Sequence, residues 1–241
     1  MGRDVEEMTM NKLAIDTSTD ILSVAIMKEN NVVAETMTIV KKDHSSKLMP
    51  TVVQLMDEVQ LTPEQVQKVI VGNGPGSYTG TRIGVTMAKT FAWSLNIPIY
   101  TESSLRNLAK NVCTEDVLIC PFFDARRQNV FAGLYERRSG TLETVQEDRH
   151  LALDLLLREL NEQHKHVIFL SPHIIESVRA SIEHSLGNKA QFVEPVFHNP
   201  RASHMLYVDR EKEPSPVHLV APNYIRLTEA EANLLQKKKD E

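Results

Sequence analysis

The stretch NGPGSYTGTRIGVTMAKTFAW, residues 73–93, places glycines and a proline in a loop that runs directly into an apolar helical pattern. Gly74, Gly76 and Gly80 allow positive φ angles or the close approach of another group. A loop that opens a helix also offers free N–H groups to an anion. The first chemical hypothesis is therefore phosphate binding, with Gly74, Gly76 and Ser77 as the expected contacts.

The common nucleotide-binding motifs are not matched by this loop. A Walker loop requires G-x-x-x-x-G-K-[ST], but Gly74 and Gly80 are one residue too far apart and Thr81-Arg82 follows them. The dinucleotide pattern G-x-G-x-x-G fails because Thr79 stands at the third glycine position. A tight strand-to-helix turn that packs closely against a neighbour is an equal alternative.

The segment DTST, residues 16–19, is the second candidate for anion binding. Asp16 ends an expected strand, and Thr17 and Ser18 supply hydroxyl and N–H donors to an anion or to a metal-bound water. In the alternative interpretation, Asp16 only caps the hairpin turn through its own backbone.

Composition and charge narrow the class of protein. With 241 residues and a net charge of -5, the chain suits one large or two small domains and has no basic surplus for binding nucleic acid without a partner. No apolar run approaches the ~18 residues of a membrane span, and the first residues lack a hydrophobic signal, so a cytoplasmic protein without a membrane contact is expected. Cys113 and Cys120 form neither a disulfide framework nor a zinc pattern.

The order of expected elements repeats once along the chain. The first half is expected to contain strands at 12–16, 21–29 and 32–40, and then a helix from about residue 46. Pro50 is tolerable only in the first turn of that helix. The elements that follow are a strand at 68–73, a helix to about 96, a strand at 98–103 and a helix at 103–112. The second half repeats that order, with strands at 117–125, 129–137 and 141–146, a helix at 151–160, a strand at 166–171, a helix at 174–186 and a strand at 191–195. The expected fold is α/β with two subdomains, 11–112 and 113–228, each with a mixed sheet. Residues 1–10 are expected to be an extended or disordered N-terminus, and residues 229–241 a solvated charged tail.

Duplicated units of this kind are the plan of the actin-like, Hsp70-like and sugar-kinase-like ATPases. The segments KLAIDTSTDILSVAI, HSSKLMP, VGNGPGSYTGTRIGVTMAKTFA, IYTESSLRNLA, FDARRQNVFAGLY and PNYIR closely resemble the bacterial TsaB family of tRNA threonylcarbamoyladenosine biosynthesis proteins. The resemblance runs from residue 12 to about residue 226. It implies a duplicated actin-like fold and a non-catalytic paralogue of the transferase TsaD. The implied role is to pair with TsaD and act with TsaE in threonylcarbamoyl transfer to the adenosine beside the tRNA anticodon, reaching tRNA only through the complex.

Two departures from the catalytic relatives argue against an enzyme. TsaD carries an H-x-x-x-H metal pair in the helix that follows, and alignment places Ser104 and Leu108 there, which cannot bind a metal. The second hairpin reads Asp124-Ala125-Arg126-Arg127-Gln128, without the glycines that admit phosphates, and Asp124 and Arg126 contact a partner or pair with each other. We therefore expect no metal and no cofactor. The rival functions are an active sugar-kinase-like phosphotransferase and a metallopeptidase.

Two surfaces are expected to meet a partner. Met49, Val53 and Met56 widen the apolar face of the first helix beyond what one sheet covers, so the isolated chain is expected to form a homodimer through the TsaD-binding surface. Small residues recur every four positions in the second helix, at Gly80, Gly84, Ala88 and Ala92. We expect this small-residue stripe to face the partner, with packing on the protein's own sheet as the alternative.

Overall fold

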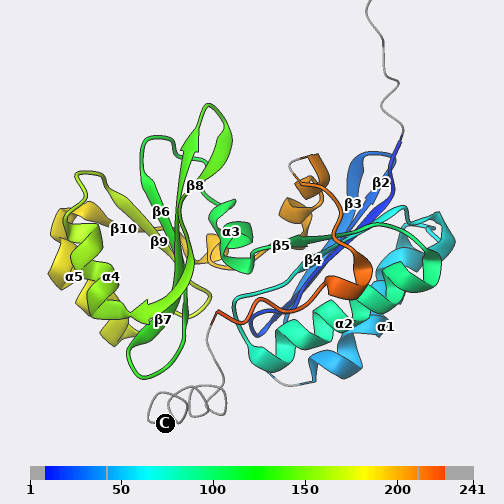
Figure 1. Ribbon diagram of the computed structural model, residues 1–241, viewed down its shortest axis with the longest axis horizontal. Helices are drawn as coiled ribbons and strands as arrows, with labels where there is room; N and C mark the ends of the chain where they lie inside the picture. Colours follow the sequence, from blue (N-terminus) through cyan, green and yellow to red (C-terminus); the bar gives the residue numbers. More distant parts are fainter. Residues whose placement is uncertain (1–8, 42, 211, 226–241) are drawn as a thin grey trace, which may run out of the picture.

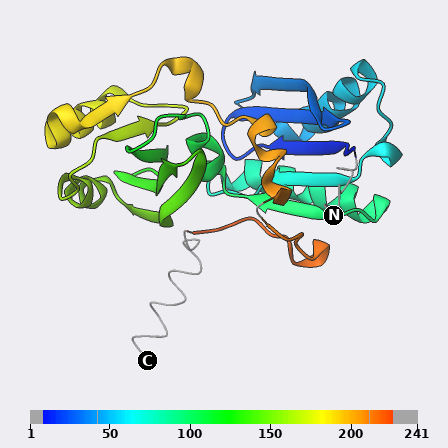
Figure 2. The same cartoon turned by 90° about the horizontal axis from the view of Figure 1, so that it is seen from above.

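The computed structural model describes residues 9–41, 43–210 and 212–225, which form two lobes lying side by side (Figure 1). Each lobe is built on one five-stranded mixed sheet. The view in Figure 2, turned by 90°, shows the two sheets as separate bodies with chain segments passing between them. The expectations for residues 1–8 and for the charged tail at 229–241 fall outside the described residues.

The first lobe carries a sheet in the order β3-β2-β1-β4-β5. Its strands are β1 (Lys12–Asp16), β2 (Ile21–Lys28), β3 (Asn31–Ile39), β4 (Lys68–Gly72) and β5 (Ile99–Glu102). The strands β1, β4 and β5 run parallel, whereas β1, β2 and β3 form an antiparallel meander. Every residue of β1 is buried, as expected of an apolar strand in the middle of a sheet covered on both faces.

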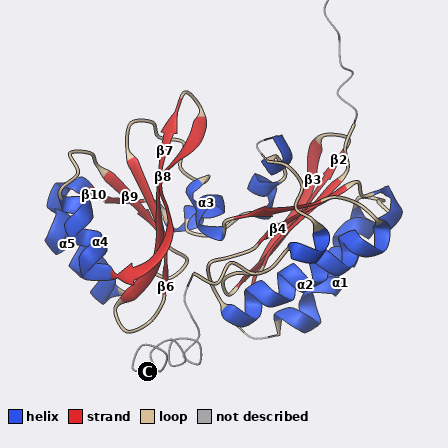
Figure 3. Ribbon diagram, viewed as in Figure 1, coloured by secondary structure: helices blue, strands red, loops and turns tan. Residues whose placement is uncertain are grey.

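Two long helices cover one face of this sheet, as Figure 3 shows. They are α1 (His44–Glu58) and α2 (Tyr78–Leu95), and their buried residues join those of β1, β2 and β4 in one hydrophobic core. Pro50 lies in the second turn of α1 rather than in the first. The carbonyl group of Ser46, which loses its helical donor there, belongs to an exposed residue and is accessible to water. The capping box at Thr62 opens only a 3₁₀ turn, Pro63–Gln65.

The second lobe repeats this topology. Its strands are β6 (Leu118–Asp124), β7 (Asn129–Arg138), β8 (Thr141–Ala152), β9 (Val167–Leu170) and β10 (Ala190–Phe192), in the order β8-β7-β6-β9-β10. The helices α4 (Leu153–Asn161) and α5 (Glu176–Leu186) cover its outer face (Figure 3). Each strand therefore has a counterpart at the same place in the first sheet, which is the duplicated actin-like plan expected from the sequence.

The lobes do not coincide with the two halves of the chain. The short helix α3 (Ser104–Ala109) belongs to the first half, yet Leu105, Leu108 and Ala109 pack against the inner face of the second sheet. In return, the 3₁₀ turn Ala202–Met205 and the residues up to Val208 pack on the first sheet. A division of the chain at 112/113 therefore does not separate the two lobes, because each half covers the other half's sheet.

The buried carboxylate of Glu102 connects segments that are far apart in the chain. Glu102, at the end of β5, accepts from Arg106 at 3.2 Å, Lys110 at 3.0 Å and Lys212 at 2.9 Å. Burial raises the pKa of Glu102, but the charges of Lys110, Lys212 and Arg106 outweigh it and hold the pKa below its ordinary value of 4.5. The carboxylate thus joins α3 to a segment more than 100 residues later in the chain.

We expect Glu102 to make stability depend on acid. Because its pKa is lowered in the folded protein, the stabilisation is complete above the unfolded-state pKa and is lost as the pH falls through the lower folded-state pKa. Urea unfolding of the protein and of Glu102→Gln, measured from neutral pH to below 4.5, should show the two free energies of unfolding converging at the acid end. A constant difference across this range contradicts the assignment.

Candidate functional site

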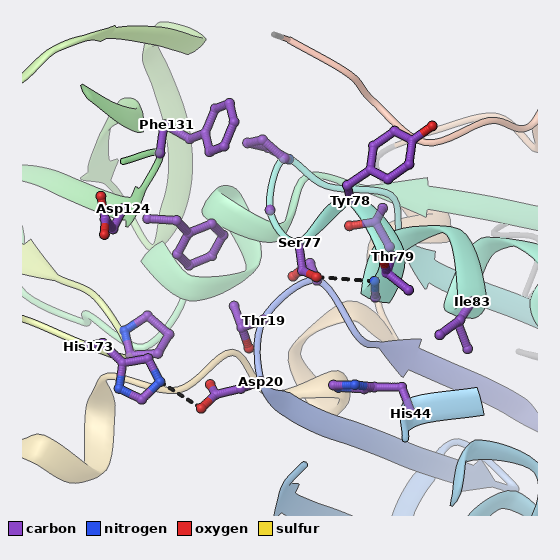
Figure 4. Close-up of a pocket in the computed structure, with 18 of the residues that line it drawn as sticks. Thr19, Asp20, His44, Ser77, Tyr78, Thr79, Ile83, Asp124, Phe131 and His173 are labelled. Carbon is purple, nitrogen blue, oxygen red and sulfur yellow. Dashed lines mark hydrogen bonds and ion pairs between the residues drawn. The ribbon is translucent and has the colours of Figure 1, made fainter. Parts of the chain in front are cut away.

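A cleft of about 980 Å³ lies between the two lobes (Figure 4). The first lobe contributes the turn between β1 and β2, the loop before α1, and the glycine loop with the start of α2. The second lobe contributes the turn between β6 and β7 and residues 171–173 after β9. The chain returns after the second lobe, and residues 223–225 form part of the wall. The cleft therefore brings together both hairpins and the glycine loop that the sequence singles out.

The glycines of this loop serve close packing against the first hairpin. A Cβ atom added at Gly76 would lie 2.2 Å from the carbonyl oxygen of Ser18, and one at Gly80 would lie 2.2 Å from that of Thr17. A Cβ atom at Gly84 would lie 2.4 Å from the Thr17 hydroxyl oxygen. Such distances are far inside van der Waals contact, so a side chain at any of these positions would push the hairpin away from the loop. The tight-turn alternative accounts for these glycines.

Several donors expected to bind an anion are already engaged within the protein. The N–H of Ser18 donates to Asp16 Oδ1 at 2.9 Å, that of Ser77 to the carbonyl of Ser18 at 2.6 Å, and that of Gly80 to Ser77 Oγ at 3.2 Å. The Thr17 hydroxyl donates to the carbonyl of Gly80 at 2.7 Å. Because an anion would have to displace these bonds, the loop is poorly prepared for phosphate.

Asp16 and Thr17 lie beneath the cleft wall and not on it, and both are fully buried. Burial raises the pKa of Asp16, and its Oδ1 accepts from both the N–H and the hydroxyl of Ser18, which is the turn-capping arrangement. Gly74 is also absent from the cleft lining. The expectation of anion contacts is thus wrong for Asp16, Thr17 and Gly74, since folding turns them inward. Ser18, Gly76 and Ser77 do line the cleft.

The second hairpin replaces glycines by residues held in the left-handed region. Arg126, Arg127 and Gln128 have φ angles of 66°, 51° and 60°. The backbone N–H of Arg126 donates to Asp124 Oδ1 at 2.7 Å, so the contact between these residues uses the backbone. Both are exposed on the cleft wall. The strain of three successive left-handed residues is balanced by hydrogen bonds within the turn, from Asn129 to the carbonyls of Arg126 and Arg127.

The comparisons with known proteins agree with this architecture. Residues 31–234 match the family model of TsaD, tRNA N6-adenosine threonylcarbamoyltransferase. The tRNA threonylcarbamoyladenosine biosynthesis protein TsaB of Bacillus subtilis is 45% identical over 95% of this chain and 100% of its own length. The chain belongs to the TsaB family. The Escherichia coli TsaB is 28% identical over 53% of this chain and 56% of its own.

Solved structures show the same fold at lower identity. YeaZ from Pseudomonas aeruginosa superposes with a TM-score of 0.74 and 21% identity, covering 89% of this chain and 99% of its own. A second structure from the same organism, of a protein similar to peptidase YeaZ, also gives a TM-score of 0.74, at 20% identity. These likenesses bear on the fold alone. In the described part of this chain, no helix is long and apolar enough to cross a membrane.

Ser104 and Leu108, the two positions expected from the sequence not to bind a metal, lie inside the protein. Ser104 and Leu108 on α3 are fully buried, and Leu108 packs in the core of the second lobe. Among the described residues, no group of three or more histidine, cysteine, aspartate or glutamate side chains is placed to hold a metal ion. Cys113 is exposed and Cys120 is buried, where burial raises the pKa of its thiol to about 12.

An apolar groove on the outer surface of the first lobe runs between α1 and α2. Its volume is about 630 Å³, and Met49, Met87 and Phe91 are among its lining residues. Met49 and Val53 are 44% and 49% exposed, as a binding face requires. Met56, by contrast, is buried in the core, so its expected place in the interface is wrong: it points to the sheet rather than outward.

The small-residue stripe of α2 faces the protein's own sheet. Ala88 and Ala92 are buried in the first core, and Gly80 and Gly84 meet Thr17 as described above. The expectation that Gly80, Gly84, Ala88 and Ala92 meet a partner is therefore wrong. Small side chains on this face let α2 approach β1 and its hairpin closely, while the larger Met87 and Phe91 line the outer groove.

Some residues of the cleft carry no motif and were missed by sequence reasoning. Asp20 ends the turn between β1 and β2 and reaches across the cleft, where its Oδ2 lies 2.7 Å from His173 Nε2 of the second lobe (Figure 4). His44 is the first residue of α1, and Tyr224 stacks on Tyr78, the first residue of α2. Polar type alone does not distinguish these positions, because only the fold places residues 20, 44, 173 and 224 around one cavity.

Proposed function

We propose that this protein is a non-catalytic subunit that pairs with TsaD and acts with TsaE in threonylcarbamoyl transfer to tRNA. The observation that carries the proposal is the apolar groove between α1 and α2, which Met49 lines, together with Val53, exposed one turn further along α1. An exposed apolar face of this kind is typical of a surface that another protein covers. The protein is expected to work in the cytoplasm and to reach tRNA through the complex.

The match to the TsaD family model supports this choice of partner. Two chains with the same fold present the same pair of helices, so that α1 and α2 of one can pack against their counterparts on the other in a near-twofold arrangement. Under twofold symmetry, the same face of two copies of this chain can also pack against itself. We therefore propose a homodimer through this groove when TsaD is absent, and a heterodimer when TsaD is present.

The structure of the cleft favours a non-catalytic role for this protein. An ATPase cleft needs free N–H donors for phosphates, and here those of Ser18, Ser77 and Gly80 already bond within the loops. The position aligned with a metal-binding histidine is held by Leu108, whose side chain belongs to the core. These features weigh against the sugar-kinase-like phosphotransferase and the metallopeptidase.

Reconstitution tests the proposal. TsaD and TsaE are incubated with ATP, tRNA and the threonylcarbamoyl adenylate, with and without this protein, and threonylcarbamoyladenosine in the digested tRNA is measured by mass spectrometry. We expect product only when all three proteins are present, and none when this protein replaces TsaD. Hydrolysis of ATP or of a peptide by the isolated protein would support a rival function. Equal product formation without it contradicts the proposal.

A further inference from the structure

Three polar atoms on the wall of the interlobe cleft are buried and have no hydrogen-bond partner among the described residues. They are Asp20 Oδ1, His44 Nε2 and Thr81 Oγ1. His44 and Thr81 are only 8% and 3% exposed. An unsatisfied buried polar atom typically costs about 1–3 kcal/mol. That several such atoms gather in one cavity indicates that a ligand supplies the missing bonds.

The chemistry of the three atoms defines what the ligand must offer. Burial lowers the pKa of His44, and this effect outweighs the ring's bond to the backbone of Ile21 and the charge of Asp20, which both raise it, so the net pKa lies below 6.5. Since Nε2 has no partner, the bond to the Ile21 carbonyl uses Nδ1–H, and neutral His44 presents Nε2 as an acceptor. Asp20 Oδ2 is occupied by His173, which leaves Oδ1 as a second acceptor. The ligand must therefore donate two hydrogen bonds, and Thr81 can give or take a third.

Aromatic side chains line the same cleft. Tyr78 and Tyr224 stack with ring centroids 5.0 Å apart and planes inclined by 28°, and both are about half exposed. Phe123 and Phe131 line the side formed by the second lobe. In Figure 4, Asp20 and His44 lie on one side of the cavity, and Phe131 and Tyr78 lie on the opposite side. Aromatic faces accept a planar base without selecting its identity.

We infer that the interlobe cleft binds a nucleoside, holding the ribose diol at Asp20 and His44 and the base against the aromatic side chains. A vicinal diol supplies the two donors, and a carboxylate that accepts from ribose hydroxyls is a recurrent arrangement in dinucleotide sites. The volume of about 980 Å³ is within the range of small-molecule sites. This goes beyond the proposed pairing with TsaD, which uses the groove between α1 and α2. That groove adjoins the cleft at Ser45 and Ile83, which line both.

The same wall disfavours phosphates. The carboxylates of Asp20, Asp43 and Asp124 line the cleft, against the cations of Lys41 and Arg126. The loop donors that an anion would use are engaged, as described above. A nucleoside without phosphates is therefore the better fit than ATP.

Calorimetric titration of the isolated protein tests the inference, with adenosine as the probe. We expect adenosine to bind and 2′,3′-dideoxyadenosine, which lacks only the two hydroxyls, to bind about tenfold to a hundredfold more weakly. ATP should bind no more tightly than adenosine. Equal binding of adenosine and its dideoxy analogue overturns the inference. So does the absence of adenosine binding at millimolar concentration, which means that water alone satisfies the three atoms.

Variants locate the site. Asp20→Ala should weaken adenosine binding by about tenfold or more, while leaving dideoxyadenosine binding little changed. Thr81→Val, which removes a bond outside the diol, should weaken the binding of both. Asp43→Asn, which removes the same charge from an exposed residue of the same cleft, is the matched control and should bind adenosine normally. Melting temperatures show whether each variant is folded. If Asp43→Asn and Asp20→Ala weaken binding equally, or if a folded Asp20→Ala binds adenosine normally, the assignment fails.

Discussion

Replacing Ala88 by leucine is expected to lower the free energy of unfolding by about 1–3 kcal/mol, the usual cost of overpacking a core. Ala88 is fully buried where α2 packs on the first sheet, among apolar residues that include Leu13, Ile15 and Val71. Three added carbon atoms have no space there, so α2 must move away from β1. Chemical denaturation of the isolated protein measures the loss.

The matched control for this prediction is Ala180→Leu. Ala180 lies in α5 of the second lobe and is exposed, so the same substitution there adds no volume to the core. Its stability should stay within about 0.5 kcal/mol of the parent. An Ala88→Leu variant as stable as the parent would mean that the small-residue stripe is not packed on the sheet.

Replacing Val53 by aspartate is expected to weaken pairing through the surface around the α1–α2 groove, because Val53 lies one helical turn from Met49, which lines that groove. Val53 is exposed in the isolated chain, so the charge is solvated there and the melting temperature should hardly change. In a dimer the same carboxylate is buried against an apolar surface without a partner, which costs enough to weaken binding by about a hundredfold. Light scattering of the isolated chain and titration into TsaD measure the two pairings.

Leu155→Asp serves as the control for Val53→Asp. Leu155 lies on α4 of the second lobe and is 47% exposed, close to the 49% of Val53, so the two substitutions change charge and apolar surface alike. Only the Val53 variant should lose the homodimer and the TsaD complex. If both variants bind as the parent does, or if both fail, the α1–α2 groove is not the interface.

The order of the elements follows from the sequence alone. Short apolar segments such as 12–16 and 68–72, broken by turn residues, fix the strands, and their repetition predicts the two sheets. The extent of β8, Thr141–Ala152, exceeds the six residues predicted, because pairing with β7 extends a strand of weak local pattern. Local periodicity thus determines which elements exist, and partners determine where they end.

The tertiary structure decided which side of each element faces inward. The sequence shows that α2 has a small-residue face and a larger apolar face, and both are apolar enough to be buried. Contacts with Thr17, more than 60 residues away, place Gly80 and Gly84 on the inside and leave Met87 and Phe91 at the groove. The exchange of α3 and residues 202–208 between lobes, and the meeting of Asp20, His44 and Thr81 in one cleft, depend on such long-range contacts as well. The local spacing of residues does not predict these long-range contacts, since a helical or strand period fixes the angle between side chains but not the direction of the core.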